Sequence, residues 1–219
     1  MIYFRNLLYN IVKYVSKSGV SMNINTTYTK IITGEDLMET AQHGSTLYPF
    51  QFYYEDLSVF DFNCIEWHWH TELEFIYIES GTVTLWIGED QFHLTEGNGI
   101  FINTKVLHRL YSPSKALIPN FVFMPSFIAP CDSLIYQKYI LPIISSSLPF
   151  LVFHKKVCWQ AKVLSIMRQI ISAQDSVLSK ELLTSSLLQN LWLEIFENTD
   201  ISYQEEHKDH STASQARLQ

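Results

Sequence analysis

The fold is decided by residues 68–81, which are His68-Trp69-His70-Thr71-Glu72-Leu73-Glu74-Phe75-Ile76-Tyr77-Ile78-Glu79-Ser80-Gly81. Side chains of a β-strand alternate between its two faces, so the even spacing of His68, His70 and Glu74 places all three on the same side of a sheet. Two imidazoles and a carboxylate suit Fe(II), Mn, Ni or Zn. Buried polar groups are also commonly satisfied without a metal. The prediction is therefore a metal-free pocket with no cofactor, and one divalent ion is the alternative.

Around this stretch the sequence predicts short strands separated by turns. Phe50, Phe52 and Tyr54 alternate with other side chains in the period-two pattern of a strand. Turn residues follow at 88–90 and again at 96–99. Because no helical pattern interrupts the series, it predicts an antiparallel sandwich or barrel. The expected strands are 50–54, 64–70, 74–79, 82–87, 91–95, 100–102, 107–111, 117–123 and 151–153.

The hydrophobic period changes near the C-terminal end. A short helix is expected over 134–141, ended by Pro142, and a longer one over 157–171. Asp175-Ser176 is expected to cap a second long helix, whose broad apolar stripe predicts contact with another subunit or, alternatively, only with the barrel. The candidate dimerisation residues are Leu183, Leu187, Leu191, Trp192 and Ile195. The barrel's apolar row at Trp67, Trp69, Leu73, Phe75 and Tyr77 must be covered by the opposing sheet or by these helices.

Composition excludes several classes of protein. The 219 residues are 47% hydrophobic, which suits one domain plus an appendage. No run of about 18 apolar residues is present, so no membrane span is expected. The net charge of −7, with no basic run longer than Lys155-Lys156, opposes direct nucleic-acid binding. Three widely spaced cysteines favour reduced thiols, and we expect a cytoplasmic protein.

The pattern His-x-His, three residues, Glu, six residues, Gly is similar to the first conserved motif of the cupins, with Phe62 in place of its leading Gly. His108 stands where the second cupin motif has its histidine, although Asn103, Lys105 and Ser112 depart from that motif. The resemblance implies a mainly β fold, an antiparallel cupin (jelly-roll, double-stranded β-helix) barrel followed by two C-terminal α-helices.

A narrower resemblance rests on four segments, His43-Gly44, Tyr48-Pro49-Phe50-Gln51, His70 to Gly81 and Asn103 to His108. They resemble the effector-binding and dimerisation half of AraC-type transcription regulators over most of residues 35–198. The resemblance implies a homodimer, an N-terminal arm over a pocket for an unknown small-molecule effector, and no enzymatic activity. The implied pocket residues are His68, His70, Glu74, Ile76, His108 and Tyr111.

Five parts are expected: an extension at 1–21, either a short helix or disordered, an arm at 22–47, the barrel at 48–154, a helical pair for dimerisation at 155–198, and a linker at 199–219. The resemblance implies that the linker leads to a helix-turn-helix module. We expect that module to be absent from this chain, and DNA contact to occur only through it.

Two alternatives remain open at this point. One is a metal-dependent cupin dioxygenase or isomerase that uses His68, His70, Glu74 and His108. The other is a naturally truncated partner that dimerises with full-length regulators and inactivates them.

Overall fold

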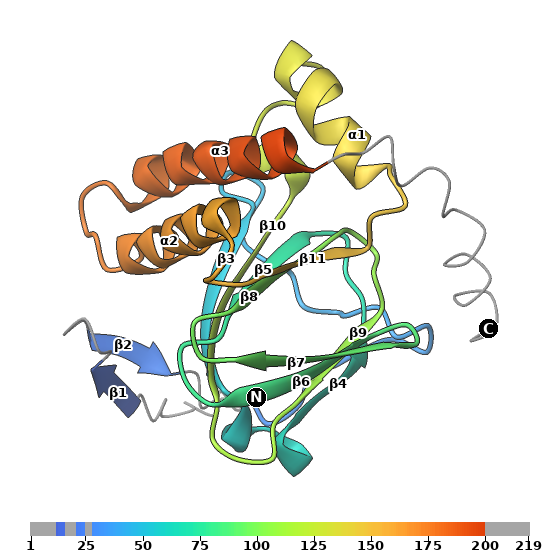
Figure 1. Ribbon diagram of the computed structural model, residues 1–219, viewed down its shortest axis with the longest axis vertical. Coiled ribbons are helices and arrows are strands. Elements are labelled where there is room, and N and C mark those ends of the chain that lie inside the picture. Colours follow the sequence, from blue (N-terminus) through green and yellow to red (C-terminus); the bar gives the residue numbers. More distant parts are fainter. Residues whose placement is uncertain (1–11, 16–20, 25–27, 200–219) are drawn as a thin grey trace, which may run out of the picture.

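The computed structural model describes residues 12–15, 21–24 and 28–199 (Figure 1). Two antiparallel sheets face each other, and two long helices, α2 and α3, cover the outer face of one of them. The five-stranded sheet has the order β11-β8-β5-β10-β3, and the four-stranded sheet has the order β4-β9-β6-β7. The strands are β3 Phe50–Asp56, β4 Cys64–His68, β5 Leu73–Tyr77, β6 Thr82–Ile87, β7 Asp90–Thr95, β8 Gly99–Ile102, β9 His108–Tyr111, β10 Leu117–Phe123 and β11 Phe150–Phe153.

The prediction of a mainly β, jelly-roll fold with two C-terminal helices is confirmed. The helices are α1 Leu141–Ile144, α2 Cys158–Ala173 and α3 Lys180–Asn198. Among the described strands, the two sheets lie face to face without closing into one continuous hydrogen-bonded barrel.

Strand β5 separates two hydrophobic cores, because its side chains alternate between the two faces of its sheet. Leu73, Phe75 and Tyr77 point towards α2 and α3, and Phe75 stacks on Phe121 of β10 at 5.3 Å between ring centroids. Ile76 points the other way, into the core between the sheets. The helices therefore cover the apolar row at residues 73–77, which is one of the two arrangements expected. The opposite face of β5 points into the space between the sheets, where a site can form.

A tight turn fixes how β5 leads into β6. Gly81 has a φ of +87°, and a Cβ added there would lie 2.6 Å from the carbonyl oxygen of Lys115. Only glycine adopts this conformation without strain, and no other residue fits so close to the neighbouring backbone. The terminal glycine of the His-x-His motif thus has a structural role.

Three local predictions are wrong. The helix considered for residues 1–21 is a strand at β1 Val12–Val15, which pairs with β2 Ser21–Ile24, and the rest of that segment lies outside the described residues. Pro142 does not end a helix. A π-helical segment, Tyr136–Ile140, runs directly into α1, and Pro142 stands in the first turn of α1, where its missing N–H is tolerated.

The third error concerns the start of α3. Ser176 donates its backbone N–H to the carbonyl of Ala173, so Asp175 and Ser176 belong to the turn that finishes α2. Helix α3 begins at Lys180, with Ser179 as its N-terminal flanking residue.

The predicted dimerisation set is also partly wrong. Leu191, Trp192 and Ile195 are at most 3% exposed, because they pack against the five-stranded sheet and α2 within one chain. Leu183 is 41% exposed and Leu187 is half-buried, so only these two of the five predicted residues offer surface to a partner.

Candidate functional site

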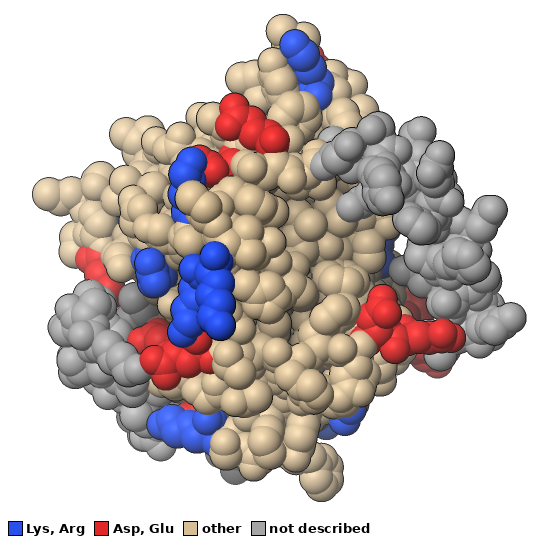
Figure 2. All heavy atoms as spheres, viewed as in Figure 1, with Lys and Arg blue, Asp and Glu red and all other residues tan. Residues whose placement is uncertain are grey.

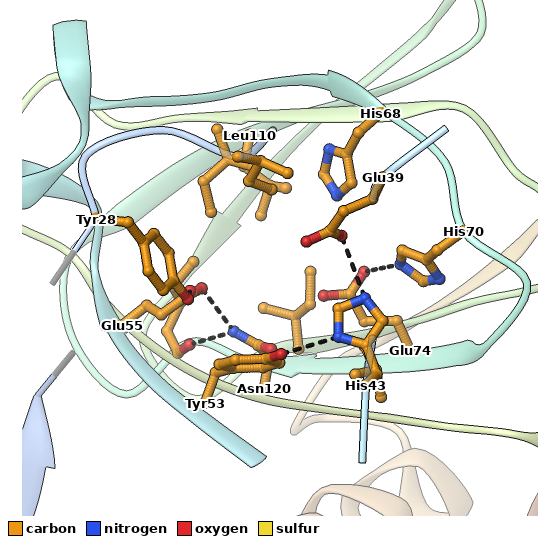
Figure 3. Close-up of a pocket in the computed structure, with 15 residues that line it drawn as sticks. Tyr28, Glu39, His43, Tyr53, Glu55, His68, His70, Glu74, Leu110 and Asn120 are labelled. Atoms are coloured by element: carbon orange, nitrogen blue, oxygen red, sulfur yellow. Dashed lines mark hydrogen bonds and ion pairs between the residues drawn. The ribbon is translucent and has the colours of Figure 1, made fainter. Parts of the chain in front are cut away.

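A cavity of about 40 Å³ lies between the two sheets (Figure 3). This is room for only a few water molecules. The sheets provide most of its walls, and the segment before β3 provides the remainder. The lining residues are Tyr28, Ile31, Glu39, His43, Tyr53, Glu55, Ile65, His68, His70, Glu74, Ile76, Leu110, Ile118, Asn120 and Val122.

Three histidines meet at one end of this cavity. His68 and His108 are paired residues of β4 and β9, with ring centroids 4.1 Å apart. His70 follows β4 and lies 5.4 Å from His108 by the same measure. One ring nitrogen from each histidine lies within 4.8 Å of the others, and all three residues are buried. The even spacing in the sequence thus correctly placed His68 and His70 together. It wrongly placed Glu74 on the same sheet, because the chain turns after His70 and Glu74 lies on β5 of the facing sheet.

The backbone fixes which nitrogen of each ring faces the cluster. Nδ1 of His68 lies 2.8 Å from the carbonyl oxygen of Glu66, Nδ1 of His108 lies 2.8 Å from that of Val106, and Nδ1 of His70 lies 3.2 Å from that of Glu72. A carbonyl oxygen only accepts, so each Nδ1 must carry the proton and donate it. Each Nε2 is left for another partner.

Glu74 is that partner for two of the rings. Its Oε2 lies 3.4 Å from Nε2 of His70 and 3.1 Å from Nε2 of His108. Burial alone would favour the neutral carboxyl, but the proximity of His108 and His70 holds the pKa of Glu74 well below its usual range. Burial would also lower the pKa of His70, yet its contact with Glu74 raises it above the ordinary value. Without a metal, these two pKa shifts favour the ionised form of Glu74 and the protonated form of His70.

His68 differs from its neighbour. Burial, followed by the charge of His108, lowers the pKa of His68 well below its ordinary value, so His68 is neutral. Its Nε2 therefore carries a lone pair that is available to a donor or to a metal ion.

These residues fit a divalent metal ion. Nε2 of fully buried His108 has no hydrogen-bond partner among the described residues, although it lies at ion-pair distance from Glu74. Metal-bound histidines typically donate their other nitrogen to a backbone carbonyl, as all three do here. His68, His70 and His108 would supply three imidazoles, which suit Zn, Fe(II), Mn or Ni. The carboxylate of Glu74 lies beside His70 and His108 but is not part of this group of three.

A second polar cluster lies at the other end of the cavity (Figure 3). Glu55 of β3 accepts hydrogen bonds from the Tyr28 hydroxyl at 2.7 Å and from Nδ2 of Asn120, on β10, at 2.9 Å. Burial raises the pKa of Glu55 to about 7, although both hydrogen bonds oppose the shift. The sequence did not predict this cluster. The single polar Asn120 within the apolar strand β10 was the available signal.

The part of the expected arm (22–47) that follows the gap in the described residues, 28–47, covers one side of the cavity. The indole N–H of Trp69 donates to the carbonyl of Asp36 at 2.8 Å, and the backbone N–H of Glu39 donates to the carbonyl of Trp69 at 2.9 Å. These bonds hold the arm so that buried His43 lies at the site, with its Nδ1 2.9 Å from the Tyr53 hydroxyl. Part of the segment expected to be an arm thus supplies lining residues.

Of the six predicted pocket residues, His68, His70, Glu74 and Ile76 line the cavity. His108 lies behind them, in contact with Glu74. The prediction of Tyr111 is wrong, because alternation along β9 turns His108 and Leu110 inward and leaves Tyr111 on the outer face. Leu110 lines the cavity instead.

Fold and cavity together define a cupin-type domain, two facing antiparallel sheets with a small polar site between them. Residues 51–192 match the family described as the AraC-like ligand binding domain, and the chain belongs to this family.

A curated relative is the uncharacterized HTH-type transcriptional regulator YdeC of Bacillus subtilis, which is 24% identical over 143 residues. The alignment covers 64% of this chain, which spans about half (48%) of the length of that relative.

Solved structures that this chain matches include a variant of apo ToxT from Vibrio cholerae, with a TM-score of 0.48 and 11% identity over 72% of this chain and 58% of that chain. A cupin-2 domain protein from Shewanella frigidimarina has a TM-score of 0.30 and 20% identity, covering 37% of this chain and 81% of its own.

Proposed function

We propose that this chain is the effector-sensing part of a transcription regulator, that it binds a small molecule in the cavity between the sheets, and that it has no enzymatic activity. The observation that carries the proposal is the arm: Tyr28, Glu39 and His43 are both lining residues and part of the segment that closes the site. Anything larger than a few water molecules has to displace this segment or reshape it. Ligand binding and arm position are therefore linked.

The strength of this linkage follows from the bonds that hold the arm. Three of them are side-chain hydrogen bonds, Tyr28 to Glu55, His43 to Tyr53, and Trp69 to Asp36. Each contributes about 1 kcal/mol net, and more where the partner is charged. A few kcal/mol is the size of a typical allosteric coupling free energy, about 1–3 kcal/mol. A ligand that favours one arm position can thus change the populations of the two states.

The arm linkage is tested by hydrogen–deuterium exchange of residues 28–47 in the wild type, Tyr28→Phe and Tyr111→Phe. Tyr28→Phe removes the hydroxyl that bonds Glu55, so arm exchange should become faster. Tyr111→Phe makes the same change outside the cavity and should leave arm exchange as in the wild type. Equal arm exchange in all three proteins would contradict the linkage.

The effector is then sought by screening small molecules for a rise in melting temperature. A molecule that binds the wild type in the cavity should also change the exchange of the arm. Stabilising ligands that bind elsewhere, or that leave the arm unchanged, would argue against the sensing role.

Further proposals concern DNA contact, the location of the protein in the cell and the dimer contact. Lysines and arginines are scattered among acidic residues on the face shown in Figure 2, so we assign DNA contact to a separate module. We place the protein in the cytoplasm, because a regulator must reach DNA there. Among the described helices none is long and apolar enough to cross a membrane. The dimer contact is assigned to the exposed side of α3, at Leu183 and Leu187.

The second candidate is a metal-dependent cupin enzyme, which the histidine geometry favours. His68, His70 and His108 would hold the ion, which as a Lewis acid would polarise a bound substrate. Elemental analysis of protein purified without chelator tests it. One ion per chain, lost in His70→Ala and retained in His93→Ala, would favour this candidate and call for substrate assays. Protein that binds no added Zn(II), Fe(II), Mn(II) or Ni(II) would exclude it.

A further inference from the structure

Glu55 is a buried carboxylate whose hydrogen-bond partners among the described residues are both neutral. It is 7% exposed, and each of its oxygens accepts one hydrogen bond, Oε1 from Tyr28 and Oε2 from Asn120. An ionised carboxylate has about four lone-pair sites. About two acceptor sites of Glu55 are thus left, on a side chain that lines the cavity.

The residues that line the cavity include more acidic side chains than basic partners for them. Three carboxylates line it, and no lysine or arginine is among its described lining residues. Glu74 lies beside His70 and His108, and Glu39 lies 3.3 Å from Nε2 of His43. Glu55 makes no ion pair in the described part of the chain. A buried charge without a counter-ion is costly, so an incoming positive charge would stabilise the ionised form of Glu55 against its protonated form.

An independent observation shows that the cavity has polar groups still without a hydrogen bond. His43 is 6% exposed and lines the cavity, and its Nε2 makes no hydrogen bond among the described residues, although it lies 3.3 Å from Oε2 of Glu39. Buried polar atoms in native proteins nearly always have such a partner. A polar ligand would supply one.

We propose that Glu55 is the counter-ion for a small ligand that carries an ammonium group, and that the cavity selects organic amines over carboxylates and phosphates. The proposal rests on the proposed function, since the amine would be the effector. An ammonium group has three N–H donors and a positive charge, so it matches the free acceptor sites of Glu55. An anion would instead enter a cavity that already holds three carboxylates. An alcohol would leave the charge of Glu55 unmatched.

Three probes small enough for a cavity of this volume test the proposal: methylammonium, methanol and formate. They have similar size and differ in charge, so the arm does not need to open for any of them. The side-chain amide signal of Asn120, which bonds Glu55, reports binding in an NMR titration. Methylammonium should shift this signal to saturation, methanol should bind more weakly, and formate should not bind.

Two matched variants assign the effect to Glu55. Glu55→Gln keeps the shape and removes the charge, so methylammonium should bind about ten-fold or more weakly. Glu89→Gln makes the same change in net charge at an exposed residue of the β6–β7 turn, away from the lining, and should bind as the wild type does. Because the Gln variant removes a buried charge, it should fold at least as stably.

The amine assignment would be overturned by formate binding as well as methylammonium, by unchanged affinity in Glu55→Gln, or by no methylammonium binding to the wild type. None of these results would argue against the sensing role, which is tested separately by hydrogen–deuterium exchange of the arm. Conversely, amine binding with an unresponsive arm would keep the assignment and refute the sensing role.

Discussion

The buried charge of Glu55 makes a quantitative prediction about stability. In the folded protein, burial raises the pKa of Glu55 to about 7 from an ordinary value of 4.5. The folded state therefore binds more protons than the unfolded state in this window, and stability falls as the pH rises through it. At about 1.4 kcal/mol per pH unit, the loss approaches about 3 kcal/mol above the folded pKa. Glu55→Gln cannot ionise, so it escapes this loss.

Chemical denaturation of the wild type and Glu55→Gln at several pH values measures the effect. The stability of the variant relative to the wild type should rise by about 2–3 kcal/mol between about pH 5 and about pH 8. Other titrating groups act on both proteins alike and cancel in the difference. Glu89→Gln, at an exposed position, should show a difference that stays flat with pH. A flat difference for Glu55→Gln as well would mean that Glu55 has a counter-ion or solvent access, and the reasoning about its charge would fail.

Three further outcomes are expected. Leu191→Ala should lower the free energy of unfolding by about 2–5 kcal/mol in urea, because Leu191 is 1% exposed. Leu182→Ala, at a residue 77% exposed, should change it by less than about 0.5 kcal/mol. Gly81→Ala should cost more than about 1 kcal/mol by the same assay, since its Cβ would meet the backbone of Lys115. Leu183→Asp should convert dimers into folded monomers in sedimentation experiments, whereas a surviving dimer would place the subunit contact elsewhere.

Much of the fold was predictable because period-two patterns are local. The predicted limits of the strand at 117–123 coincide with those of β10. Helix ends were harder, since Asp175 and Ser176 suit the end of one helix as well as the start of the next. The assignment of Leu191 and Trp192 to a second subunit failed for a related reason. Helical spacing shows that residues share a face, but the same spacing serves a contact within the chain and one between chains.

The two ends of the cavity differed in how predictable they were. His68, His70 and Glu74 lie close together in the sequence, so a local motif identified them, although Glu74 lies on β5 of the facing sheet rather than on the strand of His68. Glu55 and Asn120 are 65 residues apart and meet only because β3 and β10 pair in one register. No local sequence pattern predicts how β3 and β10 align with each other. The error at Tyr111 was avoidable, because an inward His108 already implied an inward residue 110.

The packing around β5 indicates which part of the molecule can transmit ligand binding. Strand β5 carries Glu74 towards the cavity and Phe75 towards the helices, so a shift of this strand would have to move both cores. Phe75 is fully buried and stacks on Phe121 and on Phe123. Close-packed interiors resist displacement, since each shift forfeits many contacts. The arm is held by a few hydrogen bonds, each worth about 1 kcal/mol, and by the partly buried side chains of Tyr28 and Ile31 against the core between the sheets. On the proposed function, a ligand in the cavity therefore changes the arm at lower cost than the helix pair, and the signal to the rest of a regulator leaves through the arm.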